Sequence, residues 1–433
     1  MGRYFSKTPR GIVSGKTSAR SPYWFGRKGL PGLINSLCRI LSVNGPSVIG
    51  LDRKALLEKA ARLTGLDDTG DRSFFEPLAV LLQSIESDAR LNLVGRLCFR
   101  GDILRMLCNR LYLQEDRRRY PHIADQVISA PLFITGLPRT GSTLLHALLA
   151  SDPASRAPQV WEVMYPSPPP QRTSYNRDPR IDKTAGDLKW LGIIMPGFKR
   201  VHMIGPGLPQ ECIAITAHSF ISYLFESMYF VDSYRAWHER QDKHAAYVYH
   251  RQFLQHLQAF APGTHWVLKA PSHLFALKAL LGVYPDARIV LTHRDPLEAL
   301  PSCASFTEVL RGAFTDAIDR EKLGREIARH WQKGASLAVE FSQTNRMTRE
   351  PPLNILYTDL IRDPMGVVRL IYRHFEMKFT NEAEEAMLRF LAKNPQNSNG
   401  VHHYSLGEFG LDQDRERRRF AFYTDFFGIE PVS

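Results

Sequence analysis

The stretch that decides the fold is Pro131–Leu149, PLFITGLPRTGSTLLHALL. Its first residues form an apolar run of strand length, and Gly136–Gly141 contains glycine and proline at positions that a helix interior does not tolerate. The apolar residues that follow predict a helix beginning near Ser142. Because unpaired backbone N–H groups and the positive end of the helix dipole face such a loop, the segment predicts an anion site, typically for phosphate.

The loop is close to a Walker A sequence, G-x-x-x-x-G-K-[ST], but Ser142 occupies the position of the lysine. In a nucleoside triphosphate site, that lysine reaches the β and γ phosphates. Arg139 inside the loop and the missing lysine favour a different phosphate ligand. An ordinary turn between a strand and a helix is the alternative, but it needs fewer donor groups than this loop contains.

The segment Pro138–Thr143 resembles the 5′-phosphosulfate loop of sulfotransferases, which bind 3′-phosphoadenosine 5′-phosphosulfate (PAPS). The resemblance extends over roughly residues 51–433 and rests on three motifs in order. It implies that the phosphosulfate is held by the loop residues Arg139, Thr140, Gly141, Ser142 and Thr143.

The order of elements after residue 131 predicts an α/β fold, a P-loop-like parallel sheet flanked by helices. Apolar runs of strand length recur at 265–269, 287–292 and 353–357. Helical spacing of apolar residues occurs at 211–230, 244–260, 273–283, 364–375 and 381–392. In such a sheet, ligands bind at the carboxyl ends of the strands.

Before the sheet, the patterns at 52–62, 75–86, 92–101 and 102–113 predict an all-helical lead-in without catalytic residues. We therefore expect a flexible basic extension at 1–50, the lead-in at 51–129 and the sulfotransferase domain at 130–433. Within that domain, prolines and glycines over 176–207 predict a long insertion with only short helices, which is a candidate acceptor-binding lid.

The net charge of +12 is concentrated near the N-terminus, because no acidic residue precedes Asp52. An amphipathic helix at 33–41 could contact an anionic membrane there, and a solvated tail is an equal alternative. We expect no nucleic-acid partner. The five cysteines lack metal-ligand spacing and favour a cytoplasmic protein, and no apolar run reaches the length of a transmembrane helix. Nothing in the sequence indicates an oligomeric state.

A second anion site is predicted where Thr292–Ser302 follows a buried strand. Arg294 comes just after the strand, and a helix from Pro296 would bring Ser302 alongside it two turns later. A guanidinium and a hydroxyl suit a phosphate dianion. In sulfotransferases, an arginine and a serine at this spacing bind the 3′-phosphate of PAPS; a surface arginine paired with Asp295 is the alternative.

Lys269 ends another predicted strand and resembles the lysine of the Lys-Thr-His segment of cytosolic sulfotransferases. It would stabilise the charge that develops on the bridging oxygen. Pro271 replaces the histidine base of that segment, so the base must be sought elsewhere. The candidates are Glu162, Glu211 and His273. We rank Glu162 first, because other branches of the family place a glutamate in that region, and we expect it to open the second strand.

Tyr357 matches the tyrosine that lies near the adenine in the family's Tyr-Glu-Asp-Leu segment, although Thr358 does not match. The segment from Asn399 to Gly410 resembles the tail of the bacterial branch, where His402 or His403 could complete the 3′-phosphate site. A metal site at these histidines lacks a carboxylate or thiol at ligand spacing, and we expect no metal.

Taken together, the resemblance implies sulfuryl transfer from PAPS to the hydroxyl of an unidentified acceptor. The Met- and Pro-rich insertion and the basic N-terminus favour a hydrophobic or lipid-like acceptor, with a peripheral membrane contact. Two alternatives stay open. A P-loop kinase or NTPase would need a lysine at Ser142, and a nucleotide-binding protein without catalysis would differ only in lacking the base.

Overall fold

A five-stranded parallel sheet with the order β2-β3-β1-β4-β5 forms the centre of the molecule. The computed structural model describes residues 49–196, 198, 203–344, 348–395 and 405–430. The strands are β1 (Leu132–Gly136), β2 (Ser155–Arg156), β3 (His265–Lys269), β4 (Arg288–His293) and β5 (Leu353–Leu356). The predicted parallel α/β sheet is therefore confirmed.

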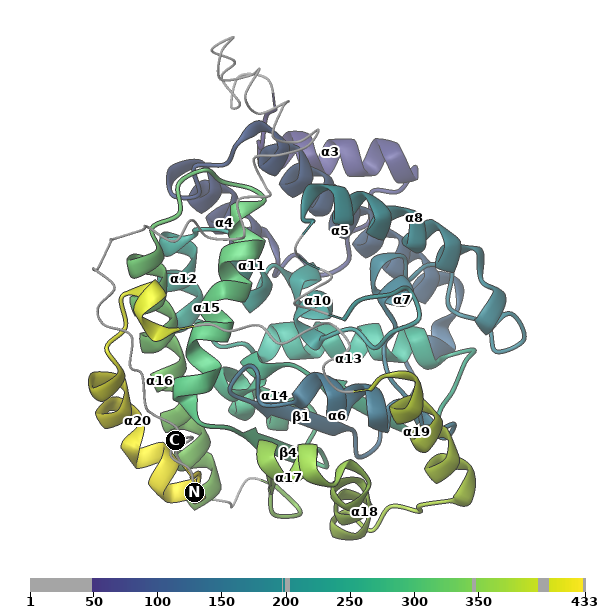
Figure 1. The fold of residues 1–433 in the computed structure, drawn as a ribbon. Helices are drawn as coiled ribbons and strands as arrows, with labels where there is room; N and C mark the ends of the chain where they lie inside the picture. Colours follow the sequence, from purple (N-terminus) through teal and green to yellow (C-terminus); the bar gives the residue numbers. More distant parts are fainter. Residues whose placement is uncertain (1–48, 197, 199–202, 345–347, 396–404, 431–433) are drawn as a thin grey trace, which may run out of the picture.

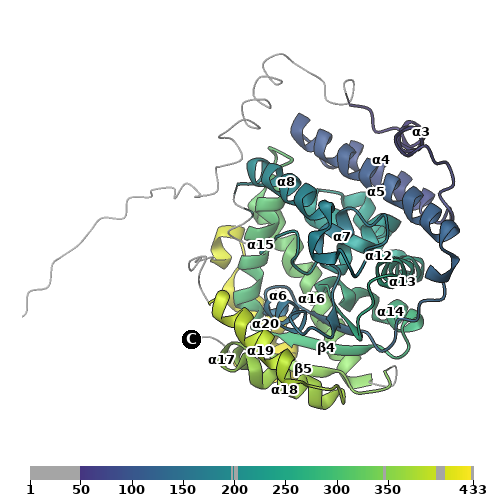
Figure 2. The ribbon, with the colours of Figure 1, turned by 90° about the vertical axis from the view of Figure 1, so that its right-hand side faces the viewer.

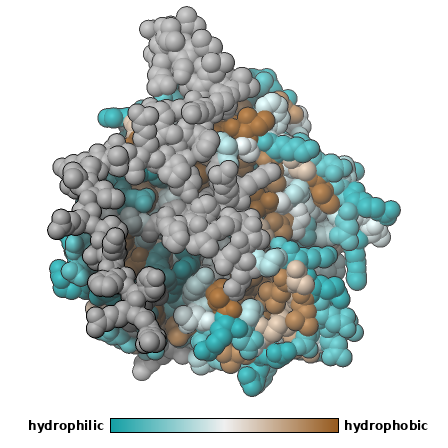
Figure 3. Space-filling view, in the orientation of Figure 1, coloured by the Kyte–Doolittle hydropathy of each residue, from teal (hydrophilic) through white to brown (hydrophobic). Residues whose placement is uncertain are grey.

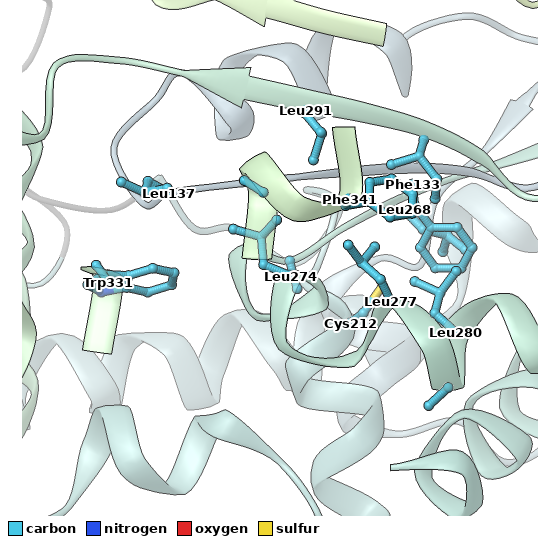
Figure 4. Close-up of a cluster of buried hydrophobic side chains, with 14 of the residues drawn as sticks. Phe133, Leu137, Cys212, Leu268, Leu274, Leu277, Leu280, Leu291, Trp331 and Phe341 are labelled. Atoms are coloured by element: carbon cyan, nitrogen blue, oxygen red, sulfur yellow. The ribbon is translucent and has the colours of Figure 1, made fainter. Parts of the chain in front are cut away.

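Helices cover both faces of the sheet (Figures 1 and 2). Side chains alternate between the faces, as the pleat of a strand requires. Leu132 and Ile134 of β1 pack on one face with residues of α6, α18 and α19. Phe133 points to the other face, where it packs with Leu268, Leu291 and residues of α13, α14 and α16, as Figure 4 shows in part. Burial on both faces explains why these strands are continuously apolar.

The α-helices of the first half have the following bounds: α3 (Arg53–Thr64), α4 (Phe75–Ser87), α5 (Leu93–Arg119), α6 (Ser142–Leu149), α7 (Val160–Met164), α8 (Pro179–Ile194), α10 (Cys212–Thr216), α11 (Tyr223–Met228) and α12 (Asp232–Arg240). Those of the second half are α13 (His244–Gln258), α14 (Leu277–Val283), α15 (Pro296–Gly312), α16 (Arg320–Thr344), α17 (Tyr357–Arg362), α18 (Pro364–His374), α19 (Asn381–Lys393) and α20 (Gln413–Phe427). Short 3₁₀ helices occupy Pro121–Ile123, Tyr175–Arg177, Ala217–Ser219, Pro271–Ala276 and Leu406–Phe409.

Helices with clear end signals were predicted well. Asp52 caps α3 by accepting a hydrogen bond from the Ala55 amide at 2.8 Å, and Gly65 ends that helix in the left-handed conformation with φ of 70°. Pro296 is the first residue of α15, as expected.

Three predicted elements differ from the structure. The two helices expected at 92–113 are one helix, α5, because Gly101 is exposed and the core contacts on either side of it outweigh the cost of about 1 kcal/mol for an interior glycine. The insertion contains a helix of 16 residues, α8, capped by Asp178. The single helix expected at 211–230 is broken into α10 and α11, because Phe220 adopts a left-handed conformation with φ of 58°.

The helical lead-in shares a hydrophobic core with the insertion. Buried residues of α3, α4 and α5 pack in one cluster with Met195 and Phe198 after α8, with Phe220 and Phe225, and with Leu310 of α15. The lead-in helices therefore pack directly against the residues that follow α8. The expected helix at 33–41, Cys38, His402 and His403 lie outside the described residues.

Candidate active site

The loop between β1 and α6 adopts the conformation that an anion site needs. Arg139 and Gly141 both have positive φ, 66° and 80°, and α6 begins at Ser142. A side chain at Gly141 would place its Cβ 2.8 Å from Leu360 Cδ2 and 3.1 Å from Tyr357 Cδ2. Only glycine therefore fits, both for its backbone conformation and because the loop lies directly against α17.

The loop is also fixed to the end of β4. The Thr140 and Thr292 hydroxyl oxygens lie 2.6 Å apart, and Thr140 Oγ1 donates to the Leu137 carbonyl at 2.8 Å. Both threonines are fully buried. At the end of β1, a Cβ on Gly136 would lie 2.2 Å from the Thr292 carbonyl oxygen. The first and second predicted anion sites are consequently held against each other.

Arg139 lies between Arg294 and Ser302, two residues that were predicted to form a separate anion site. Arg139 Nε donates to Ser302 Oγ at 3.0 Å, and Arg294 donates through Nη1 to the Arg139 carbonyl oxygen at 3.1 Å. The Arg294 guanidinium lies 4.1 Å from the centroid of the Tyr357 ring, within range of a cation–π interaction. Its carboxylate partner is Glu298 at 3.0 Å, one helical turn into α15, rather than Asp295. Asp295 instead caps that helix through the Leu297 amide.

Lys269 and Glu211 form an ion pair beside the start of α6. Lys269 lies at the end of β3 and is 2% exposed, and its Nζ donates to a Glu211 carboxylate oxygen and, at 3.2 Å, to Thr143 Oγ1. Glu211 is the residue before α10, and its side chain keeps 18% of its surface exposed. The ammonium group, the carboxylate and the loop hydroxyl therefore meet at one point.

Glu162 occupies a different environment from the one expected. It lies in α7 rather than in the second strand, and it is fully buried. One of its oxygens accepts from Arg156 Nη2 at 2.7 Å, and the other accepts from the Gln159 amide at 2.9 Å, which forms a capping box. Both oxygens are thus engaged in structural contacts. Its role as the base stays a prediction.

His273, the third candidate base, is buried in the 3₁₀ helix Pro271–Ala276 that follows β3. Its Nδ1 lies 2.6 Å from the Tyr247 hydroxyl, and burial lowers its pKa well below the usual value. A histidine with such a low pKa is a weak proton acceptor at neutral pH. Of the three candidates, Glu211 alone lines the cavity described next.

A cavity of about 1080 Å³ runs from the loop into the helical layer. Its first part is polar and is lined by Arg139, Ser142, Thr143, Glu211, Lys269 and Arg294. The lining of its second part, from α5, α8, α11 and α15, is mostly apolar, with Met106, Leu188, Leu191, Met228, Phe306 and Leu310, and also includes the charged residues Asp102, Arg105, Lys183 and Asp187. The Lys269–Glu211 pair belongs to the polar lining, and Ile213 and Ala214 of α10, which follow Glu211 closely in the chain, line the same cavity.

The sequence profile described as the sulfotransferase family matches residues 131–381, more than half of the chain. The protein belongs to the sulfotransferase family. Two solved mycobacterial sulfotransferases share the fold. STF1 of Mycobacterium tuberculosis is 32% identical with a TM-score of 0.76, and the match covers 86% of this chain and 99% of that one. STF9 of Mycobacterium avium is 29% identical with a TM-score of 0.79, and the match covers 87% and 97%.

A curated relative is the omega-hydroxy-beta-dihydromenaquinone-9 sulfotransferase Stf3 of Mycobacterium bovis and of Mycobacterium tuberculosis. It is 26% identical over 268 residues, which are 58% of this sulfotransferase and 64% of the relative. The match therefore spans less than two thirds of that relative's length.

Two features of the site were missed. The lead-in was expected to contain no catalytic residues, and its contribution to the cavity was not predicted: α5 lines the cavity and places the ion pair Asp102–Arg105 (3.0 Å) on its wall. Charge pairs three residues apart are common on solvent-exposed helices, so the sequence of α5 contained no specific signal of a cavity. The pairing of Lys269 with Glu211 joins residues 58 positions apart and has no local sequence signature.

Within the described part of the chain, no group of three or more His, Cys, Asp or Glu side chains is arranged to hold a metal ion. The same residues include no helix with the length and hydropathy of a membrane span.

Proposed function

We propose that this protein transfers the sulfuryl group of PAPS to a hydroxyl group of a lipid-like acceptor. The observation that carries the proposal is that the Lys269–Glu211 pair and apolar side chains of α5, α8, α11 and α15 line one cavity. In this proposal, a hydroxyl at the end of an apolar chain approaches the pair from the helical side of the cavity, and an anionic donor approaches it from the loop.

The polar part suits a donor with two separated anions. The N-terminus of α6 and Arg139 can hold the phosphosulfate, and the Arg294 and Ser302 side chains lie next to that loop, where a second phosphate can bind. Tyr357 offers a ring face beside Arg294 for the adenine. PAPS supplies an activated sulfuryl group, whose bond to the bridging phosphate oxygen breaks during transfer.

Glu211 and Lys269 each have a separate role in the proposed transfer. The acceptor oxygen attacks sulfur in line with the bridging oxygen, and the acceptor proton passes to the Glu211 carboxylate. The bond from sulfur to the bridging oxygen breaks, and the electron pair stays with the departing 3′,5′-bisphosphate of adenosine (PAP). Lys269 donates a hydrogen bond to that oxygen as its negative charge grows. When Lys269 turns to the donor, the Glu211 carboxylate is released to accept the proton.

The relative Stf3 is named as a sulfotransferase of omega-hydroxy-beta-dihydromenaquinone-9, which supports an acceptor of the same broad class. The apolar lining of the second part of the cavity supports it independently, since a hydrocarbon chain gains about 0.8 kcal/mol for each buried CH₂ group.

The test is a titration with PAP and, separately, with ATP and Mg²⁺, followed by a turnover assay with PAPS and hexadecanol. We expect PAP to bind and ATP with Mg²⁺ to bind much more weakly, because one triphosphate cannot place anions at both sites. Preferential binding of ATP would overturn the donor assignment. Binding of PAP without any sulfated product would mean a nucleotide-binding protein without catalysis.

A further inference from the structure

The exposed residues among those that line the cavity mark where it opens to the surface. They come from two parts of the structure. Arg139 is exposed at the donor loop, whereas Gly101 and Tyr112 of α5 and Lys183 and Trp190 of α8 are exposed in the helical layer. The lining of the cavity therefore reaches the surface at the loop and again at α5 and α8, and we infer a second opening between these two helices.

The second opening is bordered by large apolar side chains. Trp190 and Ile193 on α8 are 61% and 48% exposed, and Tyr112 and Leu97 on α5 are 37% and 52% exposed. In Figure 3, hydrophobic surface lies over the region where Figure 1 labels α5, α7 and α8. We use the name "rim" for Leu97, Tyr112, Trp190 and Ile193.

The charges near the rim suit a lipid headgroup layer. Lys189 of α8 is exposed, and Lys183, which lines the cavity, is also exposed but places its Nζ 3.8 Å from the centroid of the Tyr165 ring. The neighbouring acidic groups are mostly engaged, since Asp187 accepts from the Tyr165 hydroxyl at 2.6 Å and Asp102 pairs with Arg105; Asp182 is exposed. Trp and Tyr prefer the interface between membrane and water, and long lysine side chains reach from apolar surface to the headgroups.

We propose that the rim docks on the surface of a lipid bilayer, so that the acceptor passes from the bilayer into the cavity without crossing water. The proposal rests on the lipid-like acceptor proposed above. A hydrocarbon chain that left the bilayer through water would pay about 0.8 kcal/mol for each exposed CH₂ group. An opening pressed against the bilayer avoids that cost. The contact is made by α5 and α8 rather than by the basic residues before Asp52.

The test uses the double variant Leu97→Glu with Ile193→Glu in the full chain. Neither residue lines the cavity, so PAP binding and turnover of hexanol, a short water-soluble alcohol, should stay unchanged. Flotation with phosphatidylcholine vesicles, with and without phosphatidylglycerol, measures membrane binding. We expect the double variant to bind both kinds of vesicle at least about tenfold more weakly, because two apolar contacts are replaced by charges.

Leu388→Glu is the matched control, since Leu388 is 49% exposed on α19, away from the cavity. It should bind vesicles like the unmodified protein. The double variant should also raise KM for hexadecanol held in vesicles about tenfold, with little change for hexanol.

The proposal is overturned if the double variant binds vesicles normally, or if the unmodified protein binds none. Binding that needs phosphatidylglycerol, disappears in high salt and is unchanged in the double variant would assign the contact to the basic N-terminus instead. A failure of the proposed function has a different signature, because hexanol would then not be sulfated by any of these proteins.

Discussion

The two ends of the cavity are built in different ways. The donor end stands on the carboxyl ends of β1, β3 and β4, whose register pairs Ile134 with Lys269 and Gly136 with Thr292. The acceptor end is formed by side chains from helices that are far apart in sequence. On the proposed assignment, the sheet sets the positions of the reacting groups, whereas helix packing sets the shape of the space that the acceptor enters. Changes at one end should therefore leave the other intact.

The largest effect is expected at the Lys269–Glu211 pair. Glu211→Gln should lower kcat by about 10²–10⁴-fold, because the amide cannot accept the acceptor's proton. PAP affinity, measured by titration, should change little.

Glu162→Gln is the matched variant at the buried glutamate. It should lower the free energy of unfolding by about 3 kcal/mol, since Arg156 loses its buried counter-charge, while the folded fraction keeps its kcat. Urea unfolding and turnover measured on the same samples separate the two effects. Lost turnover in a folded Glu162→Gln protein, with an active Glu211→Gln protein, would assign the base to Glu162.

At the donor end alone, Arg294→Ala should weaken PAP binding by about 10–100-fold, as expected for a lost hydrogen bond to a charged group. Titration with PAP measures this. Arg362→Ala is the control, because Arg362 lies nearby on α17 but is paired at the surface with Asp359. Equal losses in both variants would show that the effect is general electrostatics and not a phosphate contact.

The stability of the protein should depend on pH through His146 of α6, the helix that follows the donor loop. Burial and the charge of Lys269 lower the pKa of His146 to about 3, and its Nε2 lies 3.2 Å from the Val267 carbonyl oxygen. The folded protein therefore keeps His146 neutral, whereas the unfolded chain binds a proton there below pH 6.5. The free energy of unfolding is unaffected by this histidine above pH 6.5 and decreases as the pH falls toward 3.

Urea unfolding at pH 7 and at pH 5 gives the free energy of unfolding at each pH. The decrease between pH 7 and pH 5 should be smaller by about 2 kcal/mol in His146→Gln than in the unmodified protein. An unchanged pH dependence would mean that His146 accepts a proton in the folded protein.

The smallest effect is expected at the acceptor end. Gly101 lines the cavity, and a Cβ added there would meet no neighbouring part of the molecule within 4 Å, so Gly101→Leu should fold and fill part of the apolar space. KM for hexadecanol should rise about tenfold while hexanol is unaffected, since roughly two buried CH₂ groups would be displaced. Gly186→Leu on α8 is the control, because Gly186 has equal space but lies off the cavity. A matching loss with both alcohols would indicate damage to the donor end.

The donor end could be predicted from the sequence because its motifs are short and each lies next to the strand that positions it. Each anion-binding group follows an apolar strand within a few residues, and the strand order of a parallel sheet places those ends together. The structure places Arg139, Lys269 and Arg294 on one cavity, with Ser302 in contact with Arg139; their roles in binding the donor stay predictions.

The acceptor end could not be predicted in this way. The continuity of α5 depends on core contacts on both sides of Gly101, which involve residues distant in sequence. Glu162 is paired with Arg156, and the sequence does not indicate that Arg156 is buried. The choice of Glu211 over Glu162 as the proposed base needs the three-dimensional neighbours of both side chains.

The contact between Thr140 and Thr292 has a consequence for donor selection. Because the buried hydroxyls join the loop after β1 to the end of β4, neither anion site can move without the other. On the proposed assignment of the two anion sites, we expect the protein to recognise the distance between two negative groups and not their total charge. A ligand with the same charge gathered at one end gains nothing from the second site, however strongly it is attracted to the first.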